Sequence, residues 1–277
     1  MPSDAGAKGL RMSEGVVLLL RDLIHSRTGL FFEDSRMDFL LEKLEPTAQA
    51  GGYASLLDYY YALKDNDRGE WDRAWDALSV QETYFWREMP QINVLVEQIV
   101  PQWFKTRSLP FRIWSAACAT GEEPYTIAMA LDQAGWRDYP IEIVGSDASP
   151  LGLHKAEHGV YREKSFRATP PDERRKYFEP VSEGWKISGD IARRVHFRRA
   201  NLLEPGEVAP LARAHAIFCR NVFIYFSRHA IRQVVAMMAA HMVPGGHLFV
   251  GASESLLKMT TDFELAEIGD ALAYVRI

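Results

Sequence analysis

The first 80 residues carry hydrophobic side chains at helical spacing. Val17, Leu20 and Ile24 recur at positions i, i+3 and i+7, and a second apolar set repeats in a similar way just before residue 80. Pro46 and the glycine pair that follows it are expected to interrupt this pattern. No strand-like alternation occurs in the stretch. We therefore expect residues 1–80 to form a helical domain.

From Phe111 onward, short apolar runs alternate with helical stretches. Such alternation is typical of an α/β fold, with a mostly parallel sheet and helices on both faces. A helix over residues 90–105 leads into this region, and the chain closes with an antiparallel hairpin that turns at Gly269 and Asp270. The expected strands are Phe111–Ala117, Ile141–Ser146, Ala214–Cys219 and Gly246–Gly251, and the expected helices are Glu122–Ala134, Pro150–Glu157 and Arg228–His241.

Residues 161–199 interrupt this alternation. A helix is expected near Pro171–Tyr177, and short β-prone pieces follow at Trp185–Ile187 and Arg194–Phe197, with glycines beside them. We expect these pieces to form a small β insertion over residues 178–200, inside an α/β domain that spans residues 81–277.

Composition narrows the function classes. The chain is 47% hydrophobic and 25% charged, which is near the globular average and excludes a disordered or fibrous protein. A net charge of −5 argues against generic nucleic-acid binding. Two cysteines inside apolar runs do not suit a disulfide framework or a four-thiolate zinc site, and the eight histidines show no metal spacing, so we expect no metal. Without a signal peptide or an apolar stretch of about 20 residues, we expect a cytoplasmic protein that does not insert into membranes.

Candidate site residues follow the expected strands, because ligands of open α/β sheets bind beyond the carboxyl ends of the strands. The segment AACATGEEPYT has a single glycine, Gly121, and so lacks the three-glycine pattern of dinucleotide binding. The adjacent Glu122 and Glu123 suit the helix dipole, but near a ligand they would repel phosphate and attract a positively charged cofactor. Asp147 ends the next strand, where it is expected either to bind ribose hydroxyls or to cap a helix.

Two further strand ends and one upstream segment carry polar candidates. Asn201 after the third strand end is more often a turn former than a ligand contact. Arg220 and Asn221 interrupt the apolar run IFCRNVFIYF, and burial there would require partners, which favours a site. Arg87 stands beside three aromatic residues in TYFWRE. A nicotinamide-dependent oxidoreductase would share the expected sheet, but this sequence lacks the three-glycine pattern of such enzymes.

Taken in order, these motifs resemble the chemotaxis receptor methyltransferases of the CheR family. The matching pieces span residues 82–257 and read ETYFWRE, WSAACATGEEPYTIAM, SDASPLGLHKAEHGVY, NLLEP, IFCRNVFIYF and PGGHLFVGASESL. The resemblance implies a helical N-terminal domain and a Rossmann-like domain with an antiparallel β insertion. It implies S-adenosylmethionine as cofactor, S-adenosylhomocysteine as product, and methylation of glutamate side chains in the cytoplasmic helical bundle of chemoreceptors, giving glutamyl methyl esters.

The resemblance also assigns roles to residues at matching positions. Arg87 and Tyr225 would face the reacting centre. Three departures from the family pattern are Gln81 in place of Asn, Ala119 in place of Ser, and Trp86 in place of a second phenylalanine. The residues that would contact the cofactor are Gln81, Thr83, Arg87, Ala117, Gly121, Glu123, Asp147, Asn201, Leu202, Arg220 and Asn221.

The net charge of −5 is not evenly distributed, and one segment of the chain is basic. Residues 161–199 contain 11 Lys or Arg against 6 Asp or Glu. Arg193, Arg194 and Arg198 are therefore expected to dock an acidic receptor bundle, or else to form an ordinary solvated face. The insertion looks shorter than in family members that dock on a receptor's C-terminal pentapeptide, which argues against such a tether. A cofactor-binding module without catalysis and a methyltransferase with a different acceptor remain the alternatives.

Overall fold

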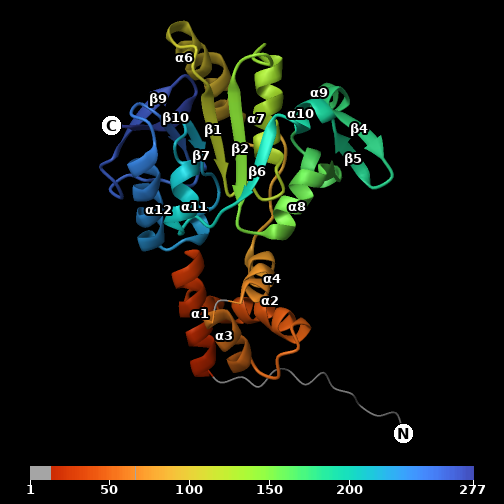
Figure 1. Cartoon of the computed structure of the whole chain (residues 1–277), viewed down its shortest axis with the longest axis vertical. Helices are drawn as coiled ribbons and strands as arrows, with labels where there is room; N and C mark the ends of the chain where they lie inside the picture. Colours follow the sequence, from red (N-terminus) through yellow and green to blue (C-terminus); the bar gives the residue numbers. More distant parts are fainter. Residues whose placement is uncertain (1–13, 66) are drawn as a thin grey trace. The chain divides into compact units, whose positions relative to one another are not determined.

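The structure is a computed structural model that describes residues 14–65 and 67–277 (Figure 1). The chain divides into two compact units, Met1–Ser79 and Val80–Ile277. The secondary-structure elements described for the first unit are all helices, and the second unit is built on a mixed sheet. The α/β fold with a preceding all-helical part, expected from the hydrophobic pattern, is confirmed.

The N-terminal unit buries the apolar stripes of its helices in one core, which includes Leu20, Ile24 and Leu44. The expected break at Pro46 is wrong, because this proline lies inside a continuous helix. A proline there removes one helical hydrogen bond, but Leu44 and Ala48 on either side are fully buried, and their packing holds the helix together. The helices are α1 (Glu14–Thr28), α2 (Met37–Ala50), α3 (Leu56–Lys64) and α4 (Arg68–Leu78), with a 3-10 turn η1 (Asp34–Arg36) before α2.

The second unit contains a seven-stranded sheet in the order β6-β2-β1-β7-β8-β10-β9. The first five of these strands run parallel, and β10 runs antiparallel to both of its neighbours. The hairpin expected around Gly269 therefore forms one edge of the sheet. The strands are β1 (Phe111–Ala116), β2 (Ile141–Asp147), β6 (Val195–Arg199), β7 (Ala216–Phe218), β8 (His247–Phe249), β9 (Phe263–Ile268) and β10 (Ala271–Arg276).

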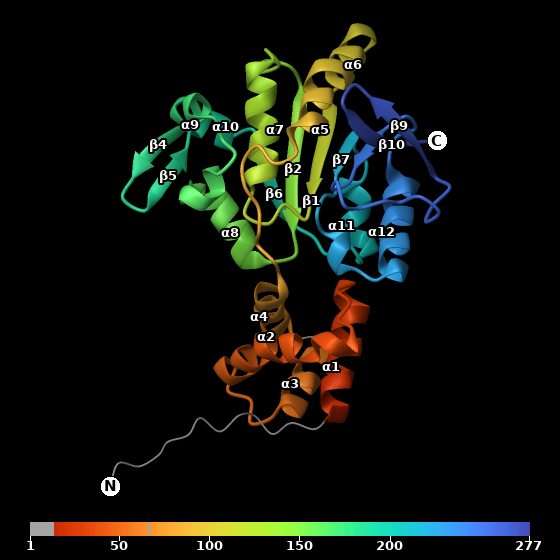
Figure 2. The same cartoon turned by 180° about the vertical axis from the view of Figure 1, so that it is seen from behind.

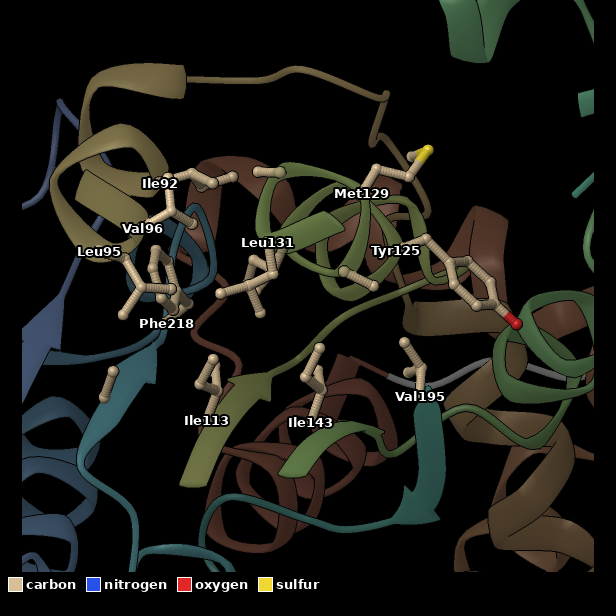
Figure 3. Close-up of a cluster of buried hydrophobic side chains, with 14 of the residues drawn as sticks. Ile92, Leu95, Val96, Ile113, Tyr125, Met129, Leu131, Ile143, Val195 and Phe218 are labelled. Carbon is tan, nitrogen blue, oxygen red and sulfur yellow. The ribbon is translucent and has the colours of Figure 1, made fainter. Parts of the chain in front are cut away.

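Helices cover both faces of this sheet (Figures 1 and 2). Side chains alternate between the faces along each strand, so Ile113 joins one core cluster and its neighbour Trp114 joins the other. Figure 3 shows the first cluster, where helical side chains such as Leu95 and Leu131 lie over Ile113 and Phe218. This cluster packs under α5 (Met89–Val94), a π-helical turn η2 (Leu95–Ile99) and α7 (Glu122–Gln133), and the second packs under α11 (Pro205–Leu211) and α12 (Arg228–His241).

The remaining helical elements connect the strands. The π-helical turn continues directly into α6 (Val100–Thr106), whose Pro101 cannot donate a backbone hydrogen bond. The other elements are α8 (Pro150–His158), η3 (Glu163–Phe166), α9 (Pro171–Tyr177), α10 (Gly189–Ala192) and η4 (Phe223–Tyr225). Within the described part of the chain, no helix has both the length and the apolar character to cross a membrane.

The β insertion differs from its expected boundaries. A separate three-stranded antiparallel sheet forms from β3 (Val160–Tyr161), β4 (Phe178–Val181) and β5 (Gly184–Ile187), and it begins before residue 178. The strand β6, which we assigned to the insertion, pairs in parallel with β2 of the main sheet. The turn α10 returns the chain to that sheet, and local alternation does not reveal which sheet a strand joins.

Candidate functional site

Loops that follow the carboxyl ends of β1 and β7 meet the segment before α5 in a cleft. The enclosed part of this cleft has a volume of about 50 Å³. Its position agrees with the rule for ligand sites in open α/β sheets. The residues that line it are Val80, Glu82, Thr83, Arg87, Ala117, Cys118, Ala119, Glu123, Arg220 and Asn221.

Backbone strain is concentrated around this cleft. Six non-glycine residues in the described part of the chain have a positive φ, and five of them belong to the segments that form the cleft. Left-handed backbone costs a non-glycine residue about 1–2 kcal/mol, and such strain clusters at functional sites. The five residues are Trp86 (63°), Glu88 (51°), Ala117 (55°), Ala119 (49°) and Asn221 (59°).

Arg220 is the buried centre of the site. Its side chain is 2% exposed, and its Nε donates to Oε2 of Glu123 at 2.6 Å. The Nη1 donates to the carbonyl of Glu88 and to Oε1 of Gln91, both at 3.1 Å, and Nη2 donates to the carbonyl of Arg87 at 3.0 Å. Four of the five N–H groups of this guanidinium are thus bound by protein atoms. Arg220 therefore clamps the segment 87–91 onto the start of α7.

The two glutamates that open α7 have different surroundings. Glu123 accepts a hydrogen bond from the hydroxyl of Ser115 at 2.6 Å as well as the bond from Arg220, and it lines the cleft. Glu122 is 2% exposed and is bound instead by the hydroxyls of Thr120 and Ser165. Burial raises the pKa of Glu122. Glu122 is therefore part of the packing, while Glu123 faces the candidate site.

Asp147 joins the loops that follow β1 and β2. Its Oδ2 accepts the N–H of Ala119 and its Oδ1 accepts the N–H of Ser149, both at 2.9 Å. The helix cap of α8 is Ser149, whose hydroxyl accepts the N–H of Gly152. The alternative that Asp147 caps this helix is therefore wrong. Its carboxylate supports the strained Ala119, which lines the cleft.

Gln81 and Gly121 lie beside α8 and outside the lining of the cleft. The amide of Gln81 donates to the hydroxyl of Ser149 at 3.2 Å and accepts from Nζ of Lys155 at 3.0 Å. Gly121 has a φ of 90°, and a Cβ built on it would stand 2.8 Å from the Cβ of Ala156. The structure thus gives Gly121 a packing role between α7 and α8.

The remaining cofactor and catalytic candidates follow β6 and β7. Asn201 forms a local turn, with its Oδ1 accepting the N–H of Leu203 at 3.1 Å. Leu202 is 5% exposed and belongs to the core under α11 and α12. Tyr225 ends the 3-10 turn η4 and is partly exposed. Of these three, none is among the residues that line the cleft.

The three docking arginines differ in how available they are. Arg193 forms an ion pair with Asp190 in the turn α10. Arg194 is partly buried and donates to the backbone carbonyl of Arg137 at 2.6 Å. Arg198 is exposed near the carboxyl end of β6, where it pairs in register with Ser146 of β2. Arg198 is therefore the docking candidate nearest to the sheet edge that holds the site.

Two residues near the site were not among the candidates. Cys118 lines the cleft, and burial raises the pKa of its thiol, which stays protonated at neutral pH. Glu254 follows the last parallel strand and accepts backbone N–H groups from the loop that carries Arg220. An acidic residue just after an apolar strand is the signal that could have identified it. The described residues contain no group of three side chains that could hold a metal ion.

Comparison with known proteins matches two family models to the chain. The model described as CheR methyltransferase, SAM binding domain, matches residues 81–271, and the model described as CheR methyltransferase, all-alpha domain, matches residues 18–79. Chemotaxis protein methyltransferase 2 of Vibrio cholerae serotype O1 is 34% identical over 92% of this chain and 91% of its own length. Chemotaxis protein methyltransferase 1 of Pseudomonas aeruginosa is 29% identical over 92% of this chain and 96% of its own length. A probable biofilm formation methyltransferase of Pseudomonas aeruginosa is 35% identical over 79% of this chain and 51% of its own length.

Proposed function

Because the chain belongs to the CheR methyltransferase family, we propose that it methylates glutamate side chains in the cytoplasmic helical bundle of chemoreceptors. The family resemblance expected from the motifs is confirmed, and S-adenosylmethionine is the cofactor of the matched domain. The names of the two chemotaxis relatives support a role in chemotaxis. The observation that carries the proposal is the strained cleft at the carboxyl ends of the sheet, which is lined by both acidic and basic side chains.

The side chains around the cleft fit a cationic cofactor. When bound, S-adenosylmethionine supplies a methyl group on a positively charged sulfur. Glu123 and Glu82 line the cleft, and the carboxylate of Asp147 lies directly behind Ala119. We propose that Asp147 binds the ribose hydroxyls and that Glu123, with Thr83 and Asn221, surrounds the charged end of the cofactor. Small residues at Ala117 and Ala119 let a ligand approach the backbone.

We propose that the cleft widens when it accepts this cofactor. Its enclosed volume of about 50 Å³ is below the roughly 300 Å³ at which pockets for small molecules begin. Arg220 is held by four hydrogen bonds and stays in place. Arg87, by contrast, is partly exposed and donates one bond at 3.1 Å to the carbonyl of Glu82. We therefore propose that Arg87 moves when the cofactor enters.

The acceptor chemistry requires positioning rather than proton removal. A glutamate side chain has a pKa near about 4.3, so the nucleophile is already ionised at neutral pH and no general base is needed. Orientation of two reactants can supply roughly 7–11 kcal/mol of the barrier. Arg87 is suited to orient the acceptor carboxylate, because its guanidinium lines the cleft and most of its N–H groups are uncommitted. Tyr225, at the end of η4, is proposed as its partner at the reacting centre.

Receptor docking is assigned to the basic face near the carboxyl end of β6. Arg198 is exposed there, and Arg193 is exposed on the preceding turn. These charges would attract an acidic helical bundle, and the attraction would weaken with salt. Arg194 contributes less, because it is committed to the backbone carbonyl of Arg137. The absence of a pentapeptide tether remains a prediction.

The role of Arg87 is tested by methyl transfer from tritiated cofactor to a purified receptor cytoplasmic fragment. Arg87→Ala should lower the rate by at least about 100-fold, because misplacement of a reacting group costs about that much. The matched control is Arg228→Ala, which removes an exposed arginine in the first turn of α12 and should leave the rate unchanged. Near-normal transfer by Arg87→Ala would refute this role.

A different acceptor is the second candidate function. The relative named for biofilm formation has about the same sequence identity to this chain as the chemotaxis relative of Vibrio cholerae. Relatives of this chain are therefore named for more than one process. Transfer of label from the cofactor to another host protein, with none to chemoreceptors, would favour this alternative. Cofactor binding without any transfer would instead favour a non-catalytic module.

A further inference from the structure

A carboxylate outside the proposed cofactor contacts links two loops at the edge of the cleft. Glu254 lies in the loop after β8, and Arg220 to Phe226 form the loop after β7. Oε2 of Glu254 accepts the N–H of Gly251 at 2.6 Å and the N–H of Asn221 at 2.8 Å. Oε1 accepts the N–H of Ile224 at 3.2 Å. One side chain thus binds three backbone donors from both loops.

These bonds hold a strained turn in place. Asn221 has a φ of 59°, a left-handed backbone that costs most residues with a Cβ about 1–2 kcal/mol and that asparagine adopts more readily than they do. Its N–H points to Glu254, so the carboxylate stabilises this left-handed backbone directly. Gly251 permits the close approach, because a Cβ on it would lie 2.6 Å from Nδ2 of Asn221 and 2.8 Å from Oε2 of Glu254.

No cation in the described part of the chain neutralises the carboxylate of Glu254. The ion pairs of the described residues do not include Glu254, and its charge is met by backbone N–H groups. Burial raises the pKa of Glu254, and the backbone hydrogen bonds oppose this rise. A partly buried acid that is bound only by loop backbone has a role in fixing the shape of that backbone.

We propose that Glu254 is a positioning residue that fixes the loop from Arg220 to Phe226, and thereby sets Asn221 and Tyr225 for methyl transfer. The proposal rests on the proposed function for its effect on rate. Asn221 lines the cleft beside Arg220, and the N–H of Ile224 immediately precedes Tyr225. Glu254 therefore holds the loop at a residue of the cleft and at the residue before the catalytic candidate.

Glu254→Gln isolates this effect because the side chain keeps its shape. The amide oxygen can still accept the N–H of Asn221, but the new NH₂ group faces the N–H of Ile224, and two donors cannot bond. We expect the Tyr225 end of the loop to loosen while the Asn221 end holds. The expected result is a kcat at least about tenfold lower, with affinity for S-adenosylhomocysteine within about threefold of the parent.

The experiment combines three measurements on the full chain. Calorimetry with S-adenosylhomocysteine gives cofactor affinity, steady-state methyl transfer to a receptor fragment gives kcat and KM, and hydrogen exchange of residues 220–226 reports the loop. The control is Glu264→Gln, an exposed change on β9 that should alter none of these. If Glu254→Gln does not fold, Glu254→Asp, which is one methylene shorter, takes its place.

The outcomes separate this proposal from the proposed function. Faster exchange of the loop with lowered kcat and retained affinity supports the role of Glu254. Unchanged exchange, or faster exchange with an unchanged kcat, overturns it. If the parent chain transfers no methyl group to the receptor fragment, the proposed function fails. In that case faster loop exchange still supports the hold of Glu254 on the loop, and unchanged exchange still refutes it.

Discussion

The pair formed by Glu123 and Arg220 offers a sharp test of how the site is held. Their side chains are 13% and 2% exposed, and their closest atoms are 2.6 Å apart. Removing one partner of a buried ion pair costs about 3–5 kcal/mol, because the other charge is left uncompensated. Arg220→Met also removes the hydrogen-bond donor of the carbonyls of Arg87 and Glu88. We therefore expect it to lower the free energy of unfolding by about 3–5 kcal/mol.

The second arm of the test is the isosteric change Glu123→Gln. It replaces an ion pair by a hydrogen bond from the charged guanidinium to a neutral amide, and we expect a cost of about 1–3 kcal/mol. The double variant carries neither charge, so neither is left buried alone. Its cost should be smaller than the sum of the single costs by about 1–3 kcal/mol, the coupling typical of residues in direct contact.

Thiol reactivity provides the assay. The chain has two cysteines, Cys118 and Cys219, and both are free, buried and located in the unit Val80–Ile277. Their modification across a urea series therefore reports the opening of this unit, independently of the helical N-terminal unit. Costs that add within about 0.5 kcal/mol would show that the two residues do not act as a pair. A cost below about 1 kcal/mol for Arg220→Met would refute the clamp itself.

Three further expectations follow from single contacts. Asp147→Asn should raise the dissociation constant for S-adenosylhomocysteine at least about tenfold in calorimetry, whereas the exposed Glu142→Gln should leave it unchanged. Gly121→Ala should lower the free energy of unfolding, measured in urea, by about 2–4 kcal/mol, because the φ is 90° and the new Cβ would lie 2.8 Å from the Cβ of Ala156. The control Gly135→Ala should lower it by only about 1–2 kcal/mol, because Gly135 has a φ of 82° but open space around it. Burial lowers the pKa of His215 to about 4, so the unfolded chain binds more protons than the folded chain below pH 6.5. The free energy of unfolding should therefore fall by up to about 3 kcal/mol as the pH is lowered from 6.5 to 4. Urea titrations of His215→Gln should show a flatter dependence on pH.

The sheet was predictable because its strands are short apolar runs with strong local signals. Trp114 and Ile113 show why: β1 buries both of its faces, so apolar residues are continuous along it. The prediction that places β6 in the small insertion sheet is wrong, because β6 pairs with β2 of the seven-stranded sheet. The alternation of apolar and polar residues around Val195 suits either sheet equally well. Pro46 was misread for a related reason, because the buried residues on both sides of it decide its helix.

The site was predictable in part. Burial of Arg220 in an apolar run implied partners, and the structure supplies Glu123, Gln91 and two carbonyls. Those partners lie 97 to 133 residues away in the sequence, so no local pattern identifies them. Glu254 stands out in the sequence only as an acidic residue after an apolar strand. Its three partners are backbone groups, so the sequence does not show what it binds.

The chemical nature of the methylated group tests the central claim most directly. The protein is incubated with tritiated S-adenosylmethionine and a receptor cytoplasmic fragment, and the washed product is then treated with mild base. Transfer to a glutamate carboxylate gives an ester, so the label should be released as volatile methanol, and Arg87→Ala should abolish most of it. Label that stays on the receptor in base, or that is found on no receptor at all, would contradict the account.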